Sequence, residues 1–379
     1  PPTVSIRSNG RYDHDPVWYR NFYYKEEAER GLDATEDLAS PGSFVFNGCD
    51  ADAVMILEAS LDRESLLDSS SAAKVRELFE RERARRSAFA TPLHRAGDSY
   101  IVQRGGGKTI IAGYPWFTDW GRDTFIALRG LCLATGRWDD AESILFDWSN
   151  TVSKGMLPNR FPDRGASPEF NSVDASLWYV VAVFEYLQSL KATGRKAASI
   201  VTTALCRTVE EIIDGFSKGT RFGISLAEDG LLRAGEAGVQ LTWMDAKVGD
   251  WVVTPRIGKP VEVQALWLNA LQIGQVLAGH RAREWEALIQ RATSSFESRF
   301  WNDRVGYLND VVDVGHIEGT VDSTLRPNQI FAVGGLPFAV LSGEKARRIV
   351  DMVESRLWTP LGLRTLSDDH PDYRATYGG

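Results

Sequence analysis

A series of expected helices in pairs constrains the fold of this chain more than any other feature of its sequence. From residue 122 onward, apolar residues recur at a spacing near 3.6, as in Leu177, Val180 and Phe184, which is typical of helices that bury one face. Loops rich in Trp, Pro, Asp and Gly separate the pairs, and strands are expected to be almost absent from this region. We therefore expect a mainly α toroid with a site assembled by loops at one end. The expected helices are 71–89, 122–135, 138–153, 173–193, 194–217, 260–278, 280–299, 325–341 and 343–355.

The first part of the chain has a different pattern. Segments 43–46 and 54–59 are typical of short strands, so we expect the tail of a β-rich domain at 1–66 and a helical domain at 67–379. A strand pair is expected near 99–102 and 109–112. The glycine-rich connection between them resembles a phosphate loop only in part, because Val102 stands where the first glycine belongs. We interpret it as a hairpin turn.

Composition excludes several classes of function. The net charge of −8 argues against a nucleic-acid partner, and the basic run 81–86 is interleaved with glutamates, as on a solvated helix face. The three cysteines (Cys49, Cys132 and Cys206) and five histidines form no metal motif, so neither a metal nor a cofactor is expected. No apolar run approaches the roughly 18 residues of a membrane span, and a cytoplasmic protein without a membrane partner is expected. The sequence does not predict the oligomeric state.

The segment 113–124 is the richest in chemical groups, with four large aromatics, two carboxylates and one arginine. Flat aromatic faces cover the C–H surfaces of sugars, and planar polar groups bind pairs of hydroxyls. Trp116 and Trp120 beside Arg122 and Asp123 therefore indicate a carbohydrate pocket at a helix start. The alternative is a helix entry packed by its own aromatics, with Asp123 or Thr124 serving the local backbone.

Polar residues also gather where later helices are expected to begin. Asn171 and Asp174 would lie at the rim of such a pocket, although their spacing also fits a helix cap with Asn171 as the N-cap. Arg326, Asn328 and Gln329 stand at the head of the expected helix 325–341. A toroid would bring these groups into one crater.

Asp245 is the candidate general acid. Trp243 and Met244 precede it and an alanine follows, and such apolar neighbours hold a carboxylic acid protonated near neutrality. Lys247 and Arg256 would weaken this interpretation if they lay close to Asp245 in space. The alternative is a structural aspartate satisfied by loop N–H groups.

Taken in order, these segments resemble the catalytic domain of glycogen debranching enzymes. The resemblance runs from about residue 70 to the end, and 15–42 is similar to the end of the N-terminal β domain of the prokaryotic members. It implies an (α/α)6 barrel related to glucoamylases and an amylo-α-1,6-glucosidase activity, in which hydrolysis with inversion removes glucose from an α-1,6 branch. The matching segments are 113–124, 170–178, 242–245, 254–262, 326–329 and 359–364.

The resemblance also implies roles for individual residues. Asp245 matches the general acid, while Arg122 and Asp123 would bind hydroxyls of the terminal glucose. Glu262 would line the pocket, unless it only stabilises the N-terminus of its helix. A branched α-glucan such as glycogen is the implied partner. The substrate-binding set is Trp116, Trp120, Arg122, Asp123, Asn171, Asp174, Trp243, Lys259 and Gln329.

Compared with the family, the sequence reads as a fragment. Residues 1–66 are too few for the whole β domain, and the expected helices are too few to close the ring. The base that activates water is expected beyond Gly379, with Glu262 as the fallback. A non-catalytic α-glucan-binding protein using the same pocket is the alternative. A phosphorylase is disfavoured because no clear phosphate pocket is evident.

Overall fold

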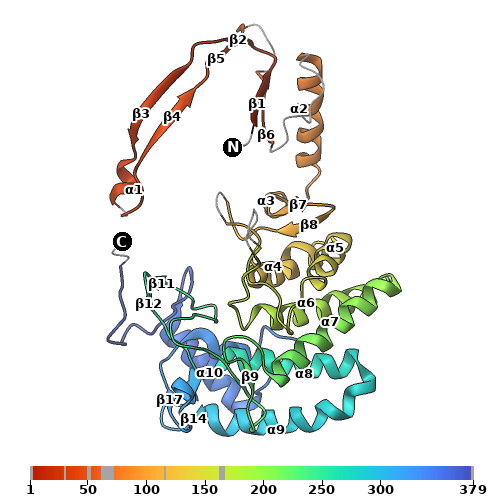
Figure 1. Cartoon of the computed structure of the whole chain (residues 1–379), viewed down its shortest axis with the longest axis vertical. Coiled ribbons are helices and arrows are strands. Elements are labelled where there is room, and N and C mark those ends of the chain that lie inside the picture. Colours follow the sequence, from red (N-terminus) through yellow and green to blue (C-terminus); the bar gives the residue numbers. More distant parts are fainter. Residues whose placement is uncertain are drawn as a thin grey trace. The chain divides into compact units, whose positions relative to one another are not determined.

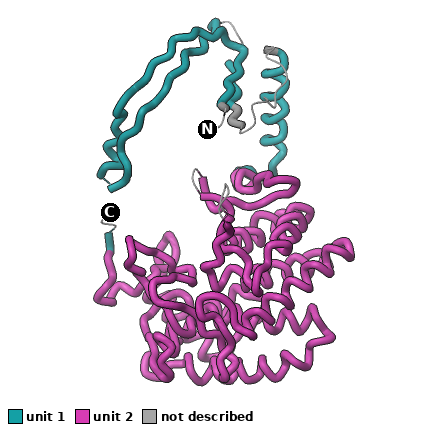
Figure 2. Tube along the Cα trace, in the orientation of Figure 1, with its two compact units in different colours: residues 1–95, 375–379 teal, residues 96–374 magenta. Residues whose placement is uncertain are grey.

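The computed structural model describes residues 3–29, 31–48, 53–60, 72–114, 117–161 and 167–376. Contacts within the chain divide it into two compact units, Pro1–Arg95 with Ala375–Gly379, and Ala96–Arg374 (Figure 2). The expected division near residue 66 stays a prediction.

The first unit contains a β ribbon built from successive antiparallel pairs. The three pairs β1–β6, β2–β5 and β3–β4 follow one another along the ribbon as separate two-stranded sheets, and β3–β4 has an irregularity between Tyr19 and Phe22 (Figure 1). The expected strands 43–46 and 54–59 are confirmed as β5 and β6. The elements are β1 (Thr3–Ser8), β2 (Arg11–Asp13), β3 (Val17–Tyr23), α1 (Lys25–Glu29), β4 (Thr35–Ser40), β5 (Ser43–Val45) and β6 (Met55–Ser60).

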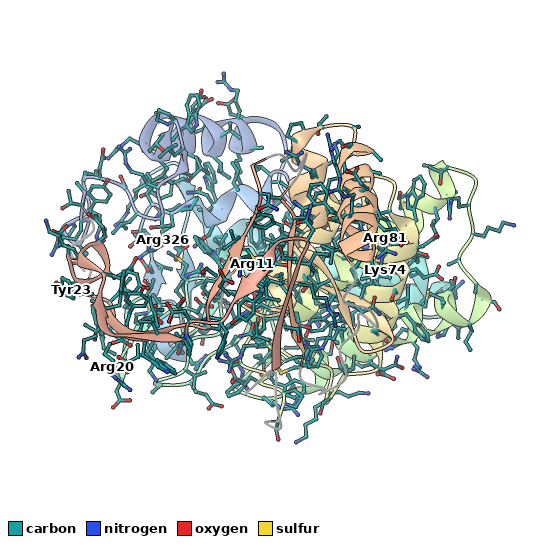
Figure 3. All side chains as sticks on the ribbon, turned by 90° about the horizontal axis from the view of Figure 1, so that it is seen from above. Arg11, Arg20, Tyr23, Lys74, Arg81 and Arg326 are labelled. Carbon is teal, nitrogen blue, oxygen red and sulfur yellow. The ribbon has the colours of Figure 1, made fainter. Side chains whose placement is uncertain are left out.

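Helix α2 (Ala72–Ser87) confirms the solvated face expected for the basic run. The Glu82 carboxylate accepts bonds from Arg85 Nε and Arg86 Nε, each at 2.7 Å, and all three side chains are largely exposed. Lys74 and Arg81 of this helix are labelled in Figure 3. These charges are paired with one another along the helix, as in a water-exposed surface.

The second unit begins with a hairpin and continues as a series of helices. Strands β7 (Ile101–Arg104) and β8 (Gly107–Ile110) pair antiparallel, which confirms the hairpin turn. The helices are α3 (Pro92–Asp98, which crosses the unit boundary), α4 (Gly121–Leu128) with a π-helical continuation (Arg129–Leu133), α5 (Trp138–Ser149), α6 (Ala175–Ala192), α7 (Ser199–Lys218), α8 (Val261–Leu277), α9 (Ala282–Phe300) and α10 (Gly343–Leu357). Short 3₁₀ helices are Gly279–Arg281, Val314–His316 and Pro327–Ala332.

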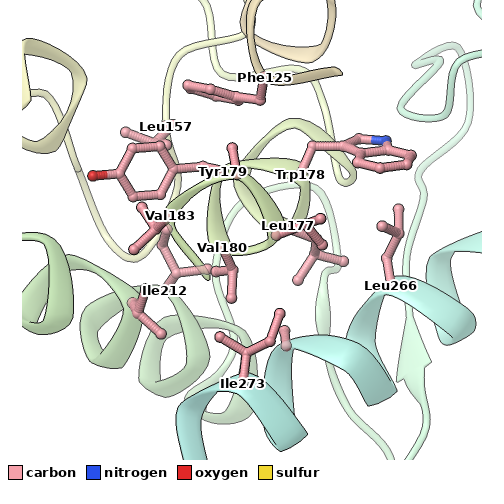
Figure 4. Packing of buried hydrophobic residues seen from close by; sticks show 14 of the residues in the cluster. Phe125, Leu157, Leu177, Trp178, Tyr179, Val180, Val183, Ile212, Leu266 and Ile273 are labelled. Carbon is pink, nitrogen blue, oxygen red and sulfur yellow. The ribbon is translucent and has the colours of Figure 1, made fainter. Parts of the chain in front are cut away.

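The helices of this unit form an inner and an outer layer. In the inner layer α4 packs on α6, and α6 packs on α8; outside them α5 packs on α7, and α9 packs on α8. Helices α6 and α8 are buried on nearly all sides, as Figure 4 shows for Tyr179, Val180 and Ile273. Apolar residues all round a helix indicate a central position, whereas α7 and α10 bury only one face. Closure into a full toroid stays a prediction.

Two expectations about this unit are wrong. Strands were expected to be almost absent after residue 122. The loops instead contain many strands of two residues, most of which pair two by two, while three of them form one sheet. They are β9 (Ser225–Leu226), β10 (Leu232–Arg233), β11 (Lys247–Val248), β12 (Trp251–Val252), β13 (Lys259–Pro260), β14 (Trp301–Asn302), β15 (Tyr307–Leu308), β16 (Val311–Val312), β17 (Val321–Asp322), β18 (Trp358–Thr359) and β19 (Gly362–Leu363).

The expected helix 325–341 is instead the 3₁₀ helix Pro327–Ala332 followed by bends. Gly335 has a φ of +79°, which a right-handed helix does not allow, and Pro337 follows two residues later. Leu336 and Leu341 are nevertheless buried. The apolar spacing there reports burial without a helix.

Candidate active site

A cavity of about 500 Å³ in the second unit brings together six of the predicted site residues. They come from segments more than a hundred positions apart in the chain. The lining residues are Ala112, Phe117, Trp120, Arg122, Asp123, Asn159, Asn171, Gln240, Trp243 and Asp245. Trp116, also predicted for the pocket, lies outside the described residues.

The start of α4 places Arg122 and Asp123 in the cavity wall. The Gly121 N–H donates to Asn159 O at 2.8 Å, and a Cβ on Gly121 would lie 2.7 Å from Pro158 O. Only glycine allows so close an approach. The loop that carries Asn159 is thereby fixed against the first turn of α4.

Arg122 joins two carboxylates from different segments. Its Nε and Nη2 donate to Asp174 at 2.8 and 2.9 Å, and its Nη1 donates to Asp245 Oδ2 at 3.1 Å. Burial opposes the charge of Arg122, but the two aspartates outweigh burial and raise its pKa. Arg122 is therefore a fixed cation in the cavity.

Asp123 lines the cavity, and within the described part of the chain its carboxylate makes no ion pair with a protein cation. Part of the Asp123 side chain is accessible to solvent, but the surrounding protein still shields its carboxylate partly from water. This desolvation raises the pKa of Asp123; Arg122 opposes the shift, and Asp245 and Asp174 add to it. A carboxyl of this kind suits hydrogen bonding to a hydroxyl or proton transfer.

Asn171 is in the cavity, and the alternative that it caps α6 is wrong. Ser172 Oγ accepts the Ala175 N–H at 3.2 Å, while Asn171 Oδ1 accepts from Asn159 Nδ2 at 3.2 Å. Asp174 does not line the cavity. Its buried carboxylate instead holds Arg122 and accepts the Ser172 hydroxyl at 2.7 Å.

Glu262 does not line the cavity either, which corrects the expectation that it lines the pocket. Its side chain is 3% exposed and makes two bonds to Arg256, the one to Oε2 at 2.6 Å. Burial raises the pKa of Glu262; Arg256 opposes this shift, and the nearby Asp310 reinforces it. The Arg256 guanidinium thus bonds both oxygens of the Glu262 carboxylate.

Lys259 and Gln329 are also buried away from the lining residues. Lys259 Nζ lies 2.6 Å from Asp229 and 2.9 Å from Asp313. Gln329 Oε1 accepts the Leu308 N–H at 3.2 Å, and its Nε2 donates to Arg326 O at 3.2 Å. Both residues therefore have protein partners, and their contact with a sugar stays a prediction.

Asp245 lies in a loop, and its side chain is not enclosed by apolar groups. Its side chain is 42% exposed, and its cationic neighbour is Arg122. Lys247 and Arg256, the cations considered from sequence, contact Gly238 O and the Glu262–Asp310 pair instead. The expectation of an apolar setting for Asp245 is therefore wrong.

Sequence reasoning did not single out Ala112, Phe117, Asn159 or Gln240 as lining residues. Within the described ranges, no group of three or more His, Cys, Asp or Glu is suited to hold a metal ion. No helix there is both long and apolar enough to cross a membrane.

Solved structures with the same arrangement of helices define the class of fold. A GH63 mannosylglycerate hydrolase from Thermus thermophilus in complex with glucose is 14% identical, with a TM-score of 0.55 over 75% of this chain and 81% of that one. An uncharacterized conserved protein from the same organism is also 14% identical and covers the same shares, with a TM-score of 0.54. The fold is therefore of the α/α glycosidase type.

Residues 95–379 match the family described as amylo-alpha-1,6-glucosidase, and residues 1–55 match the glycogen debranching enzyme N-terminal family. The chain belongs to the amylo-alpha-1,6-glucosidase family of glycoside hydrolases. The glycogen debranching enzyme of Saccharomyces cerevisiae is 25% identical over 357 residues, which cover 71% of this chain and 23% of that protein. The chain thus spans about a quarter of the length of this curated relative.

Proposed function

We propose that this chain carries the catalytic pocket of an amylo-α-1,6-glucosidase, which hydrolyses α-1,6 branch points of glycogen-like α-glucans. The observation that carries the proposal is the shared cavity of Trp120, Arg122, Asp123, Asn171, Trp243 and Asp245. Family membership supplies the class of reaction, and the cavity supplies groups that suit a sugar.

The cavity fits a terminal glucose in size and chemistry. Its volume of about 500 Å³ lies in the range of small-molecule pockets. Trp120 and Trp243 offer flat apolar surfaces for sugar C–H groups. Arg122, Asp123 and Asn171 offer donors and acceptors for hydroxyls.

In the proposed mechanism, Asp245 protonates the glycosidic oxygen, and water attacks the anomeric carbon from the opposite face. A glucose hydroxyl takes over the Arg122 Nη1 donor when the glucan binds, which frees Asp245 from its ion pair. An inverting enzyme needs a second carboxylate roughly 6.5–9.5 Å from the acid. Among the described residues, Asp123 is the other carboxylate that lines the cavity.

A non-catalytic α-glucan-binding protein is the second candidate. The burial of Glu262 against Arg256 favours it, because this removes the fallback base from the cavity. Binding of a glucan needs the aromatic and hydroxyl-binding groups but no acid and base pair.

The test is glucose release from a branched limit dextrin, followed by proton NMR to identify the anomer formed first. We expect β-glucose from the α-1,6 bond, with little release from a linear α-1,4 oligosaccharide. A form extended beyond Gly379 is assayed in parallel, and release only by that form assigns the base to the added segment. Glucan binding without release by either form supports the binding protein, and absence of both binding and release contradicts the pocket assignment.

A further inference from the structure

A buried chain of hydrogen bonds leads from Glu262, at the start of α8, to Trp243 on the cavity wall. Arg256 Nη2 donates to Glu262 at 2.6 Å, and Arg256 Nε donates to Asp310 Oδ2 at 2.8 Å. Asn328 Nδ2 donates to Asp310 Oδ1 at 2.8 Å, and Trp243 Nε1 donates to Asn328 Oδ1 at 2.8 Å. We call Glu262, Arg256, Asp310 and Asn328 the Asn328 relay.

The relay is a rigid anchor because its members are buried and are either charged or, in Asn328, a polar amide. Glu262, Asp310 and Asn328 are each 2% exposed, and the Arg256 side chain is 1% exposed. Moving any of these groups would leave a buried charge or amide unpaired, which is strongly unfavourable. Bonds linked in this way also hold one another in place.

Asn328 is the junction between the relay and the cavity. Its Oδ1 faces an indole N–H, which is only a donor, and its Nδ2 faces a carboxylate, which accepts. Rotation of the amide by half a turn would oppose two donors at Trp243 and two acceptors at Asp310. Both neighbours therefore fix one orientation of the amide.

The loop that carries Asp245 is held at its ends by backbone bonds and in its middle by Asn328. The Val173 N–H donates to Leu241 O at 2.9 Å, and the Val253 N–H donates to Ala246 O at 3.1 Å. Between these points, Asn328 bonds Trp243 and lies 3.5 Å from Met244 Sδ. The side chains that precede Asp245 are thus fixed through this one amide.

We propose that Asn328 is a positioning residue, which holds Trp243 as a wall of the cavity and thereby orients the Asp245 loop toward substrate. The proposal rests on the proposed function in that the substrate is an α-glucan. Glu262 acts through the relay and does not touch the sugar. Loss of the Asn328 amide changes glucan binding through Trp243 and not through general stability.

Asn269 of α8 is a matched control for loss of a buried amide. It is fully buried, and its side chain exchanges two bonds with the backbone of Phe338, each at 2.9 Å. It does not line the cavity. Asn269→Leu and Asn328→Leu therefore remove comparable buried hydrogen bonds, but only Asn328→Leu releases Trp243.

The first test is a double-mutant cycle in the Asp245→Asn background, in which panose, a trisaccharide with one α-1,6 and one α-1,4 bond, stays intact while its affinity is measured by calorimetry. We expect Asn328→Leu and Trp243→Phe each to lower the affinity by about 5- to 10-fold. The affinity of the double variant should be at most about twofold below that of the single variant that binds less tightly. Asn269→Leu should leave affinity unchanged alone. The proposal would be overturned if the affinity losses of Asn328→Leu and Trp243→Phe multiplied fully in the double variant. It would also be overturned if Asn269→Leu lost as much affinity as Asn328→Leu.

The second test needs no glucan and separates the relay from the proposed function. The Trp243 indole ¹H–¹⁵N signal, assigned by its absence in Trp243→Phe, should move in Asn328→Leu and stay in Asn269→Leu. Asn328→Asp, measured at the lowest pH at which the chain stays folded so that the new carboxyl is protonated, keeps an oxygen for the indole and an O–H donor for Asp310. It should retain the signal, which covers the case in which Asn328→Leu does not fold. An unmoved signal in folded Asn328→Leu, or a lost one in Asn328→Asp, overturns the relay. A chain that binds no α-glucan but shows the expected shifts contradicts only the proposed function.

Discussion

Arg122 Nη1 donates to Asp245 Oδ2 at 3.1 Å, although the two residues are 123 positions apart. The same guanidinium makes two bonds to the buried Asp174. One side chain thus ties the start of α4 to the loop of the candidate acid. The bond thus joins two parts of the cavity wall that come from separate segments of the chain.

Arg122→Lys should destabilise the chain and weaken glucan binding. Lysine keeps the charge but cannot bond Asp174 through two parallel N–H groups while also reaching Asp245. We expect a loss of about 1.5–3 kcal/mol in the free energy of unfolding, measured with denaturant. Affinity for panose should fall in the same variant.

Arg129→Lys is the matched control for this change. Arg129 makes the same kind of two-bond contact, with Glu185, at 2.6 and 2.8 Å, but it does not line the cavity. Arg129→Lys should lower the free energy of unfolding and leave panose affinity unchanged. Equal loss of affinity in both variants would show that Arg122 acts only on the fold.

The sequence predicted the helices best where burial surrounds them. Helix α6 was expected at 173–193 and occupies Ala175–Ala192, because nearly every turn carries apolar residues. At 325–341 the same kind of spacing gave a wrong helix. There, bends at Gly335 and Pro337 bury Leu336 and Leu341 without helical hydrogen bonds. Apolar spacing reports which residues are buried and leaves the backbone conformation open when Gly and Pro intervene.

For the site, the sequence correctly predicted cavity-lining residues that stand in dense motifs. It did not predict which polar residues are covered by partners from elsewhere in the fold. Arg122 and Asp123 are in the cavity as expected. Glu262 follows the same pattern of an acidic residue at a helix start, but Arg256 covers it. Such pairing depends on the tertiary fold, and the sequence spacing of six residues did not reveal it.

Glu262→Gln separates a structural role from a catalytic one. We expect a loss of about 1–3 kcal/mol in stability, because glutamine keeps one acceptor for Arg256 and Asp310 remains paired with it. Glucose release by the folded variant should stay within about threefold of the wild type. A loss of roughly 10²–10⁴-fold would instead identify Glu262 as the base.

Asp123→Asn should raise stability and lower glucan affinity. Burial raises the pKa of Asp123 above its ordinary 3.8, so the fold favours the protonated form. The stability gained from that proton is full below pH 3.8 and is lost as the pH rises through the raised pKa. The stability of the variant relative to the wild type should therefore rise with pH, measured by denaturant unfolding between about pH 5 and 8, where proteins tend to be most stable.

Asp147→Asn provides the comparison, because burial also raises the pKa of Asp147, which lies outside the cavity lining. Its stability should follow the same trend with pH, whereas its panose affinity should not change. If Asp123→Asn left affinity intact, the hydroxyl-binding role of Asp123 would be wrong.

Lys259→Met should destabilise the fold strongly without a direct effect on the cavity. Lys259 and Arg299 neutralise Asp229 and Asp313, and removal of the buried lysine leaves two carboxylates to one guanidinium. We expect a loss of about 3–5 kcal/mol at neutral pH. Panose affinity of the folded fraction should be retained, and a selective loss of affinity would return Lys259 to the binding site.

The pH dependence of the Lys259 variant gives an independent check. Burial raises the pKa of Asp229 and of Asp313, but Lys259 lowers both pKa values, and the net result lies below 3.8. Their stabilising effect is present above pH 3.8 and is lost as the pH falls through the lowered values. The difference in unfolding free energy between wild type and Lys259→Met should therefore shrink in acid.

The most direct test of the central claim is glucose release from a branched limit dextrin by the wild type and by Asp245→Asn, in the shortest form of the protein that is active. Asparagine keeps an oxygen for Arg122, so the cavity and its affinity for panose should persist. The account predicts a fall in glucose release of roughly 10²–10⁴-fold with binding retained. Undiminished release by Asp245→Asn would contradict the assignment of Asp245 as the acid.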